Sequence, residues 1–389
     1  MQNKVFFIFL IGCIGSVIGQ IQENPDTYDG PVAFEKVSIA SESYESVGAF
    51  DVNNDQKLDI VSGGFWYEGP SFQNHYAIGA AKRYGEYYDD FSTIPLDVNG
   101  DGYMDFITGG WYAGRLVWKE NPGDEGEWEE HLIADVGNIE TTRAYDIDGD
   151  GVVEIIPNTP NDSLKIFRLQ LDEKGKGTGK FTQQSIFGKP GHGLGFGDIN
   201  DNSRIDIIIP TGWLEAPEKP FEDAWKFYPD FDLGMASVPV LVGDVNQDGI
   251  NDVVVGQGHG YGLHWYEHHP EKKTDSTKWV KHTIDSFNSQ YHTMEWADLN
   301  GDGTNELITG KRYRAHNGKD PGGHDELGLY YFLWDGESYS KQVIDYGPYG
   351  DGKGTGVYFT VVDLNDDGSK DIIVAGKDGL TVYYNKATH

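Results

Sequence analysis

A nine-residue motif of the form D-x-N-x-D-G-x-x-D, complete or nearly complete, occurs seven times in this chain of 389 residues. Its copies begin at Asp51, Asp97, Asp146, Asp198, Asp244, Asp298 and Asp363. Consecutive copies lie 46, 49, 52, 46, 54 and 65 residues apart. Repeats of this length that consist of strands and turns are typical of propeller blades. The motif therefore predicts a ring of seven similar units.

Each repeat contains four strand-like segments. The first leads into the motif, the second follows it as an apolar run, the third is rich in aromatic residues and the fourth begins with one. The last repeat stops after its third strand, and the segment FEKVSI at residues 34–39 matches the fourth strands of the other repeats. We therefore predict an all-β, seven-bladed β-propeller over residues 31–389. Its N-terminal strand should complete the last blade and remove an open sheet edge.

The side chains at motif positions one, three, five and nine are oxygen donors, which suit calcium. Glycine at position six allows the loop to turn sharply. An EF-hand is excluded, because the motif lacks Glu at position twelve and its flanks are strand-like. Five copies are complete, and their predicted calcium ligands are Asp97, Asn99, Asp101 and Asp105; Asp146, Asp148, Asp150 and Glu154; Asp244, Asn246, Asp248 and Asp252; Asp298, Asn300, Asp302 and Glu306; and Asp363, Asn365, Asp367 and Asp371.

The other two copies depart from the pattern. The first has Gln56 in place of glycine, and the fourth has Asn202 at position five and Ser203 at position six. The fourth copy is therefore expected to bind calcium weakly or not at all. An alternative interpretation covers all seven copies: they are Asx-rich turns that hold the strands without a metal.

The chain is strongly acidic, with a formal net charge of −33 at pH 7. A surface of this charge argues against nucleic acid or an anionic membrane as a partner. We expect a monomer.

The first 19 residues resemble a secretory signal, with Lys4, a short apolar stretch and small residues at its end. We expect residues 1–19 to be removed, residues 20–30 to be a flexible lead-in, and the protein to be secreted or periplasmic. Alternatively, Leu10 to Cys13 form a lipoprotein box with Cys13 as the lipid anchor. Cys13 is the only cysteine, so the mature protein should have no disulfide. No later segment reads as a transmembrane helix.

The predicted strand order places two sets of residues on the face opposite the motif loops. The first strand of each repeat runs towards the motif and the second runs back, so both sets meet at one mouth of the ring. Six residues before the motif Asp lie Glu45, Phe91, Glu140, His192, Val238, His292 and Val357. Beyond the second strands lie Trp66, Trp111, Trp213, His259, Lys311, Arg312 and Tyr313. This mouth is therefore the predicted place for chemistry.

Three histidines, His192, His259 and His292, occupy mouth positions on consecutive repeats. Imidazoles that converge in this way suit zinc or another divalent transition metal. The alternative is that they are polar residues lining a solvated channel.

The connection after the second strand of the sixth repeat is unusually long, from Lys311 to about Leu327. Long ordered loops often carry function, although this one could also be a solvated insertion. Lys311 and Arg312 are candidates to bind a carboxylate or enolate oxygen. The candidates for proton transfer are His316, Tyr313 and Tyr358. The candidates for substrate binding, by stacking on sugar rings or by polar contact, are Trp66, Trp111, Trp213, Glu140 and Arg143.

The motif loops resemble those of the FG-GAP/VCBS repeat family, which forms calcium-bearing propellers, and the resemblance covers Val32 to Lys386. Four stretches show a narrower similarity: HGLGFGD, GHGYGLHWYE, YHTMEWADLNGDG and ITGKRYRAHNGKDPGGHDELGLYYF. They resemble the propeller part of aldos-2-ulose dehydratases and related secreted proteins. This resemblance implies removal of water from a sugar-derived carbonyl compound at a metal-containing propeller site.

The converging mouth and the resemblance together favour a secreted carbohydrate-active lyase, and more specifically a dehydratase that acts on a mono- or oligosaccharide. In this hypothesis a metal on the histidines polarises a carbonyl group. Two alternatives remain open. One is a non-catalytic, calcium-dependent sugar-binding or adhesion propeller, and the other is a polysaccharide lyase that cleaves glycosidic bonds by β-elimination.

Overall fold

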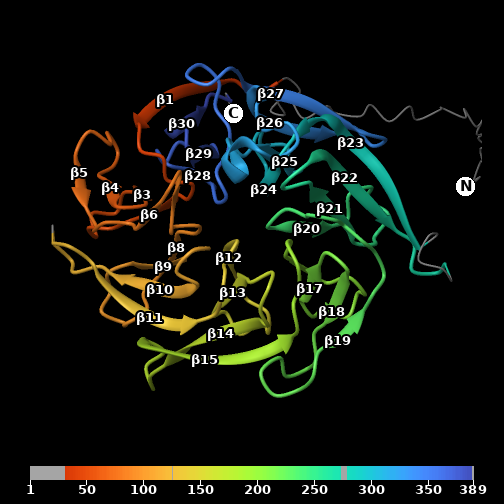
Figure 1. Ribbon diagram of the computed structural model, residues 1–389, viewed down its shortest axis with the longest axis horizontal. Helices are drawn as coiled ribbons and strands as arrows, with labels where there is room; N and C mark the ends of the chain where they lie inside the picture. The colour runs from red at the N-terminus through yellow and green to blue at the C-terminus, as the bar shows by residue number, and fades with distance from the viewer. Residues whose placement is uncertain (1–30, 125, 273–277, 388–389) are drawn as a thin grey trace, which may run out of the picture.

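The computed structural model describes residues 31–387 except residue 125 and residues 273–277. Four-stranded antiparallel sheets stand around a central axis like the blades of a propeller (Figure 1). Five sheets are separate, and the sheets of blades four and five are joined into one of eight strands. The predicted all-β propeller is confirmed, with seven four-stranded blades in the described residues.

The two inner strands of each blade flank the motif loop. The innermost strands are β2 (Gly48–Phe50), β8 (Ile94–Leu96), β12 (Thr141–Tyr145), β16 (Gly195–Gly197), β20 (Val240–Gly243), β24 (Tyr291–Ala297) and β28 (Thr360–Val362). The second strands are β3 (Asp59–Ser62), β9 (Asp105–Gly109), β13 (Glu154–Asn158), β17 (Asp206–Ile209), β21 (Asp252–Gly256), β25 (Glu306–Lys311) and β29 (Asp371–Gly376). The second strands are buried along their length because neighbouring blades cover both of their faces, which explains their continuous apolar runs.

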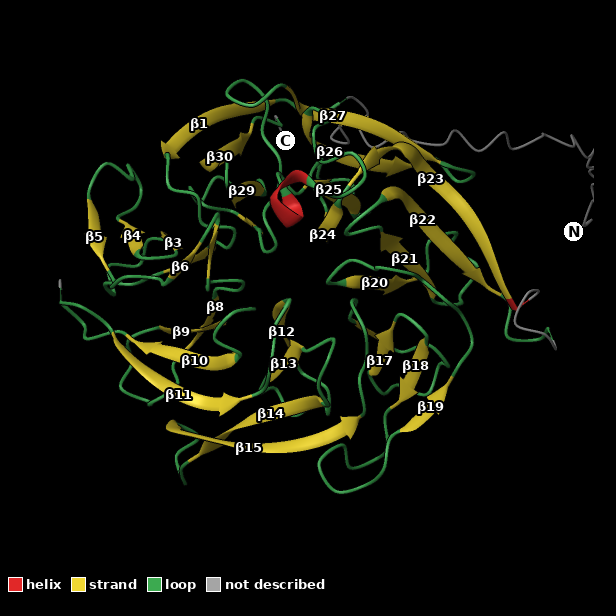
Figure 2. Ribbon diagram, viewed as in Figure 1, coloured by secondary structure: helices red, strands yellow, loops and turns green. Residues whose placement is uncertain are grey.

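The two outer strands form the rim. The third strands are β4 (Phe65–Tyr67), β10 (Arg115–Glu120), β14 (Leu164–Leu171), β18 (Gly212–Glu215), β22 (Tyr261–His268), β26 (Leu327–Trp334) and β30 (Gly379–Asn385). The fourth strands are β5 (His75–Ala77), β11 (Glu129–Asp135), β15 (Gly177–Phe187), β19 (Lys226–Tyr228), β23 (Trp279–Ser289), β27 (Tyr339–Gly347) and β1 (Phe34–Ala40). A small hairpin, β6 (Arg83–Tyr84) and β7 (Tyr87–Tyr88), lies between blades one and two. A 3₁₀ turn, η1 (Ala315–Gly318), lies near the axis (Figure 2).

The two ends of the described chain meet in blade seven. β1 pairs antiparallel with β30, from Phe34 opposite Asn385 to Ala40 opposite Leu380. It is therefore the outer strand of the sheet that also holds β28 and β29. The predicted signal peptide, the lead-in at residues 20–30 and the lipid anchor at Cys13 lie outside the described residues. Within the described ranges, no helix has the length and apolar character needed to span a bilayer.

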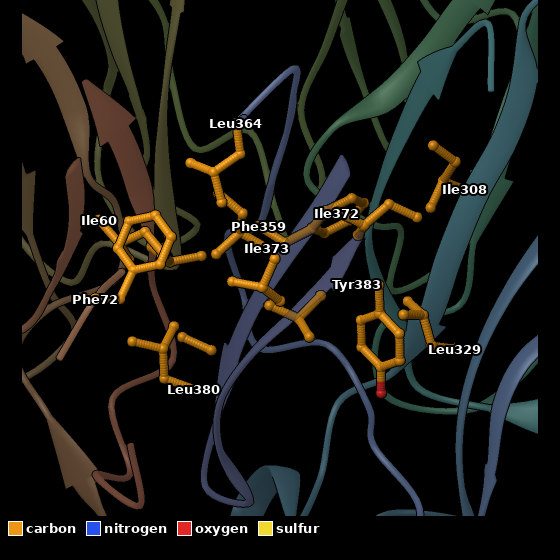
Figure 3. Close-up of a cluster of buried hydrophobic side chains, with 14 of the residues drawn as sticks. Ile60, Phe72, Ile308, Leu329, Phe359, Leu364, Ile372, Ile373, Leu380 and Tyr383 are labelled. Atoms are coloured by element: carbon orange, nitrogen blue, oxygen red, sulfur yellow. The ribbon is translucent and has the colours of Figure 1, made fainter. Parts of the chain in front are cut away.

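Apolar side chains fill the wedges between neighbouring blades. The largest cluster packs blade seven against blades six and one, and fully burying a side chain such as Ile or Leu contributes about 1.5–3 kcal/mol. Figure 3 labels members of this cluster: Ile60, Phe72, Ile308, Leu329, Phe359, Leu364, Ile372, Ile373, Leu380 and Tyr383.

The innermost strands of blades four and five pair in parallel, which joins these two blades into one sheet. Glycine makes this possible. A Cβ atom on Gly195 would lie 2.4 Å from the carbonyl oxygen of Val240, and one on Gly197 would lie 2.4 Å from the Cβ of Val242. Two glycines in β16 therefore bring the two blades into hydrogen-bonding contact.

The motif loops are closed by hydrogen bonds to their own carboxylates. In blade two, Asp97 accepts the amides of Gly100 and Gly102 at 2.8 and 3.1 Å. The buried position-nine residue Asp105 accepts the amides of Val98 and Asn121 at 2.9 and 2.8 Å, which ties the loop to the end of the third strand. The bond from position nine to the position-two amide occurs in all seven blades. These turns explain the motif without a metal, so calcium stays a prediction.

The third motif loop already contains a cation. Its ligand atoms on Asp146, Asp148 and Glu154 lie within 4.8 Å of one another. The guanidinium of Arg168 pairs with Asp148 and donates from Nε to Glu154 at 2.9 Å. This loop therefore has less need of a bound calcium ion than the other complete copies.

One buried acid predicts a pH-dependent stability. Asp90 lies beside a cavity of about 310 Å³ between blades one and two. It is 3% exposed, and its Oδ1 accepts a hydrogen bond of 3.1 Å from the Thr108 hydroxyl. Within the described residues its Oδ2 has no hydrogen-bond partner. Burial raises the pKa of Asp90 to about 7, against the weaker opposing effects of Thr108 and Lys119.

Because the folded state binds this proton more tightly than the unfolded state, the stability it contributes is present below about pH 4 and is lost as the pH rises through 7. Replacing Asp90 with Asn should remove this loss and keep an acceptor for Thr108. The free energy of unfolding of Asp90→Asn relative to the wild type should therefore grow by about 2–3 kcal/mol between pH 5 and pH 8. Urea denaturation at both pH values measures it, and a difference independent of pH would contradict the assignment.

Candidate functional site

Residues from blades three to six converge at one end of the axis. Glu140 precedes β12, His192 lies just before β16, and His292 lies at the start of β24. These are three of the positions found by counting six residues back from a motif Asp. His259 comes from the connection between β21 and β22. The structure thus brings together the three histidines predicted as metal ligands, and it adds Glu140, which we predicted as a substrate-binding residue.

The four side chains point at a common centre. Oε1 of Glu140 lies 2.8 Å from Nε2 of His292, 3.2 Å from Nε2 of His192 and 3.9 Å from Nε2 of His259. The Nε2 atoms of His192 and His259 are 2.9 Å apart, and all four ligand atoms lie within 4.8 Å of one another. Neighbouring donors on a metal with bonds of about 2.0–2.1 Å lie roughly 2.9–3.4 Å apart. Three of these separations, at 2.8, 2.9 and 3.2 Å, are close to that spacing, and the 3.9 Å between Glu140 and His259 is wider.

The hydrogen bonds behind the imidazoles fix their protons. Nδ1 of His192 lies 2.8 Å from the carbonyl oxygen of Ala236, and Nδ1 of His259 lies 2.7 Å from a carboxylate oxygen of Asp320. Both partners only accept hydrogen bonds, so both Nδ1 atoms carry the hydrogen. In the neutral rings the two Nε2 atoms then present lone pairs to each other and to Glu140. Lone pairs and a carboxylate at these distances repel unless a proton or a metal ion lies among them.

Burial keeps two of these rings neutral. It lowers the pKa of His259, and together with the charge of Arg312 it lowers the pKa of His292 well below the usual value. Burial would raise the pKa of Glu140, but positive charge among the adjacent histidines, which a shared proton or a bound cation supplies, lowers it well below the usual value, so the carboxylate is ionised. Neutral imidazoles and an ionised carboxylate are the forms that bind metal. A donor set with three nitrogens favours a transition metal over calcium.

A buried network of opposite charges surrounds this group. Arg312 donates from Nε to Glu45 at 2.9 Å and from Nη1 to Glu140 at 3.2 Å. Lys377, in the tight turn before β30, lies 3.3 Å from the other oxygen of Glu45. The formal charges of the two carboxylates and the two cations sum to zero. A divalent ion among the histidines would therefore leave this buried site with a net positive charge.

The long connection of residues 312–326 covers the mouth. Its turn η1 carries His316, whose ring stacks on that of His259 at 4.3 Å between centroids. Asp320 accepts hydrogen bonds from Nδ1 of His259 at 2.7 Å and, through its other oxygen, from Nδ1 of His316 at 2.9 Å. His316 is exposed, whereas the Asp320 side chain is largely buried. The Asp320 carboxylate thus holds both the ring of His259, in the predicted metal group, and the ring of His316, at the rim of the mouth.

The backbone of this loop is strained where it carries His316. Arg314, His316 and Asn317 have φ angles of 52°, 46° and 59°, which cost non-glycine residues about 1–2 kcal/mol each. Contacts with the β6–β7 hairpin hold the strained segment. Arg314 binds Glu86 through two hydrogen bonds, and the amide of Asn317 donates to the Tyr87 hydroxyl at 3.0 Å. Such strain is commonly found at functional sites.

A cleft of about 240 Å³ opens beside the histidine group. Its aromatic lining is Tyr87, Phe91, Trp111 and Tyr112. Its polar lining is Glu140, Arg312, His316, Asn317 and Lys319. Four predicted site residues, Trp111, Glu140, Arg312 and His316, therefore line one cleft beside the predicted metal group, as expected for a small-molecule site.

The structure contradicts the substrate-binding assignment of Trp66 and Trp213. Trp66 is 5% exposed and stacks on Tyr76, and Trp213 is 3% exposed and stacks on Tyr228. Each ring packs its own third strand against the fourth. The second and third strands of these blades are joined by only two residues, so both tryptophans fall inside the third strand. Trp111 lies in a five-residue connection and reaches the mouth.

Several other predicted residues already have partners. Lys311 is buried, and its ammonium donates to the Ser289 hydroxyl and the carbonyl of Gly322 at 2.7 and 2.5 Å, so it braces the loop. Burial lowers the pKa of Lys311 to about 8. Tyr313 stacks on Tyr349, away from the cleft. The structure therefore gives neither residue a place against a substrate.

Arg143 and Tyr358 lie inside the ring, beside the axis. The Arg143 guanidinium donates to the carbonyl of Val238 and the hydroxyl of Thr293, at 2.5 and 2.8 Å. It also lies 4.4 Å from the centre of the Tyr358 ring. Arg143 thus ties blade three to blades five and six. Neither residue lines the cleft, so their predicted roles in substrate binding and proton transfer are not supported by position.

The sequence placed Glu45 at the mouth without a specific role, and it gave no role to Asp320 or Lys377. The rule of counting six residues before the motif Asp points to Glu45, which stands at that position in the first repeat. No comparable signal exists for Asp320 or Lys377, because loop conformation decides where their side chains go. Lys319, at the rim of the cleft, was missed for the same reason.

Comparisons with known proteins agree with the fold. The FG-GAP-like repeat family model matches residues 97–156 and 223–309. The chain is similar to the crystal structure of BBS1N in complex with ARL6DN, soaked with lead, at 12% identity and a TM-score of 0.52, over 92% of this chain and 98% of that chain. The same complex soaked with mercury gives 12% identity and a TM-score of 0.50, over 91% and 97%. No curated protein sequence matches this chain.

The matched segments contain motif copies two, three, five and six, and the structural likeness covers nearly the whole chain. The chain therefore has a β-propeller fold and carries FG-GAP-like repeats in these segments. At 12% identity the likeness shows the fold alone, so the narrower resemblance to aldos-2-ulose dehydratases stays a prediction.

Proposed function

We propose that this protein is a secreted, metal-dependent carbohydrate lyase that removes water from a small sugar next to a carbonyl or carboxylate group. One observation carries the proposal: three imidazole nitrogens and a carboxylate converge beside an aromatic cleft. His192, His259, His292 and Glu140 would hold zinc or a similar divalent ion. A bound ion of this kind supplies a Lewis acid that polarises a carbonyl oxygen. The signal-like residues 1–19 support export, and the motif carboxylates support structural calcium.

In this dehydration a C–H bond beside the carbonyl and a C–O bond one carbon further break, a C=C bond forms, and the proton and hydroxyl leave as water. His316 is suited to move the proton, because it lines the cleft and Asp320 leaves its Nε2 as the acceptor nitrogen. The protonated ring then donates to the departing hydroxyl and returns to its starting state. No net charge is left on the protein.

The cleft favours a small substrate. Its volume of about 240 Å³ lies below the roughly 300–1,000 Å³ typical of sites for drug-sized ligands. Trp111 and Tyr112 offer flat apolar surfaces for one sugar ring, with Lys319 at the rim. These dimensions suit a monosaccharide or a chain end better than the interior of a polysaccharide. The balanced charges around the ion further favour a substrate with an anionic oxygen.

The proposal predicts turnover of oxidised or acidic sugars. Protein loaded with zinc is incubated with a panel of aldos-2-uloses, uronates and neutral sugars. The masses of the products are measured by mass spectrometry. We expect loss of one water from a carbonyl-bearing or acidic sugar. His316→Gln should keep sugar binding and lose turnover, because the ring that moves the proton is absent. Sugar binding without turnover by the wild type would instead indicate a binding propeller, and chain cleavage with new ultraviolet absorbance a polysaccharide lyase.

A further inference from the structure

We propose that Asp320 is a positioning residue that makes His259 a metal ligand and couples the order of the rim loop, residues 312–326, to metal binding. This inference rests on the proposed metal at the mouth. It assigns to one carboxylate a role that neither the motif repeat nor the propeller fold requires.

The position of Asp320 supports the first half of the proposal. Its oxygens lie 2.7 Å from Nδ1 of His259 and 2.9 Å from Nδ1 of His316. An ionised carboxylate only accepts hydrogen bonds, so it requires a hydrogen on both Nδ1 atoms. This leaves Nε2 of His259 as a lone pair, and Nε2 is the atom that faces His192 and Glu140. Asp320 therefore selects the metal-binding tautomer of His259, as carboxylates behind metal-bound histidines do.

The rim loop supports the second half. Arg314 and Asn317 bind the β6–β7 hairpin, and Lys311 binds the carbonyl of Gly322. These contacts fix the loop to its surroundings. Asp320 connects this loop to His259 by a hydrogen bond across 61 residues of sequence, whereas Arg312 of the same loop donates to Glu140. If the loop must be ordered for Asp320 to hold His259, a metal on His259 must in turn favour the ordered loop, because such coupling is reciprocal.

Asp320→Asn tests the tautomer directly. Asparagine replaces one acceptor oxygen with a donor NH₂, so it cannot accept a hydrogen bond from both imidazoles through separate oxygens. If the amide nitrogen faces His259, the hydrogen of that ring moves to Nε2 and blocks metal binding. We expect zinc to bind about 10–100-fold more weakly, the loss typical of removing such a partner. Bound Co²⁺ should show an altered visible spectrum, which a merely structural change in the loop would not produce.

Two further variants distinguish a loss of zinc affinity caused by the tautomer of His259 from one caused by general disruption of the loop. Asp320→Glu keeps the carboxylate and should recover most of the zinc affinity. Asp325→Asn is the matched control, because Asp325 lies in the same loop and accepts a hydrogen bond of 2.6 Å from the Tyr261 hydroxyl, outside the histidine group. Its zinc affinity should equal that of the wild type. Zinc affinities are measured by competition with a chromophoric chelator on the full chain.

Hydrogen exchange tests the coupling. Zinc should slow the exchange of amides at residues 313–320 in the wild type, and this protection should be lost in Asp320→Asn at equal zinc occupancy. Equal zinc affinity of Asp320→Asn and the wild type would overturn the tautomer role, and retained protection would overturn the coupling. A wild type that binds no zinc would overturn the proposed function together with this inference. Failure of this inference alone can therefore be distinguished from failure of the proposed function.

Discussion

Replacing His292 with alanine is expected to abolish tight binding of a divalent transition metal. His292 is fully buried, and its Nε2 lies 2.8 Å from Glu140 at the centre of the donor group. The variant keeps two imidazoles and the carboxylate but loses one of the three nitrogen donors. The dissociation constant should rise by more than the roughly 10–100-fold caused by losing only a partner behind a ligand. Metal content after mild chelation, with competition titration, measures the change.

A histidine outside the mouth provides the control for this prediction. His282 lies on the outer strand β23, where its ring stacks on Trp265 and its Nε2 bonds Glu267 at 2.8 Å. His282→Gln should therefore bind metal like the wild type. Unchanged metal affinity in His292→Ala would contradict the metal site. Unchanged turnover in a His192/His292 double variant, once a substrate is known, would contradict the catalytic role.

The sequence repeat allowed the fold and three residues of the predicted metal group to be predicted. Each motif marks the turn between the first two strands, so counting back from it locates the start of an innermost strand at the axis. That count places Glu140, His192 and His292 at the mouth, and the structure brings their side chains together. The inference succeeds because a propeller repeats the same backbone path, and position along that path determines which end of the axis a residue faces.

Residues beyond the second strand were harder to predict, because their direction depends on the length of the connection to the third strand. A two-residue connection places Trp66 and Trp213 within the third strand, where they pack internally. A connection of five residues frees Trp111 to line the cleft. The role of Asp320 depends on a strained loop path that no periodicity encodes.

Replacing Arg312 with methionine should destabilise the metal-free protein by about 3–5 kcal/mol, the usual effect of removing one partner from a buried ion pair. Arg312 is 3% exposed, and its guanidinium is shared between Glu45 and Glu140. Methionine fills much of the space but leaves the carboxylate of Glu140 without its cation. Zinc should reduce the loss, because an ion held by the histidines compensates the same carboxylate. Urea denaturation with and without saturating zinc measures both effects.

Arg314 provides a matched control two residues away. Its guanidinium pairs with Glu86 where both side chains are about one-third exposed, so solvent screens the pair. Arg314→Met should therefore cost less than about 1 kcal/mol in the free energy of unfolding of the metal-free protein. If Arg312→Met were no more destabilising than Arg314→Met, the buried ion pairs of Arg312 with Glu45 and Glu140 would not stabilise the fold. If zinc failed to reduce the loss, the ion would not lie beside Glu140.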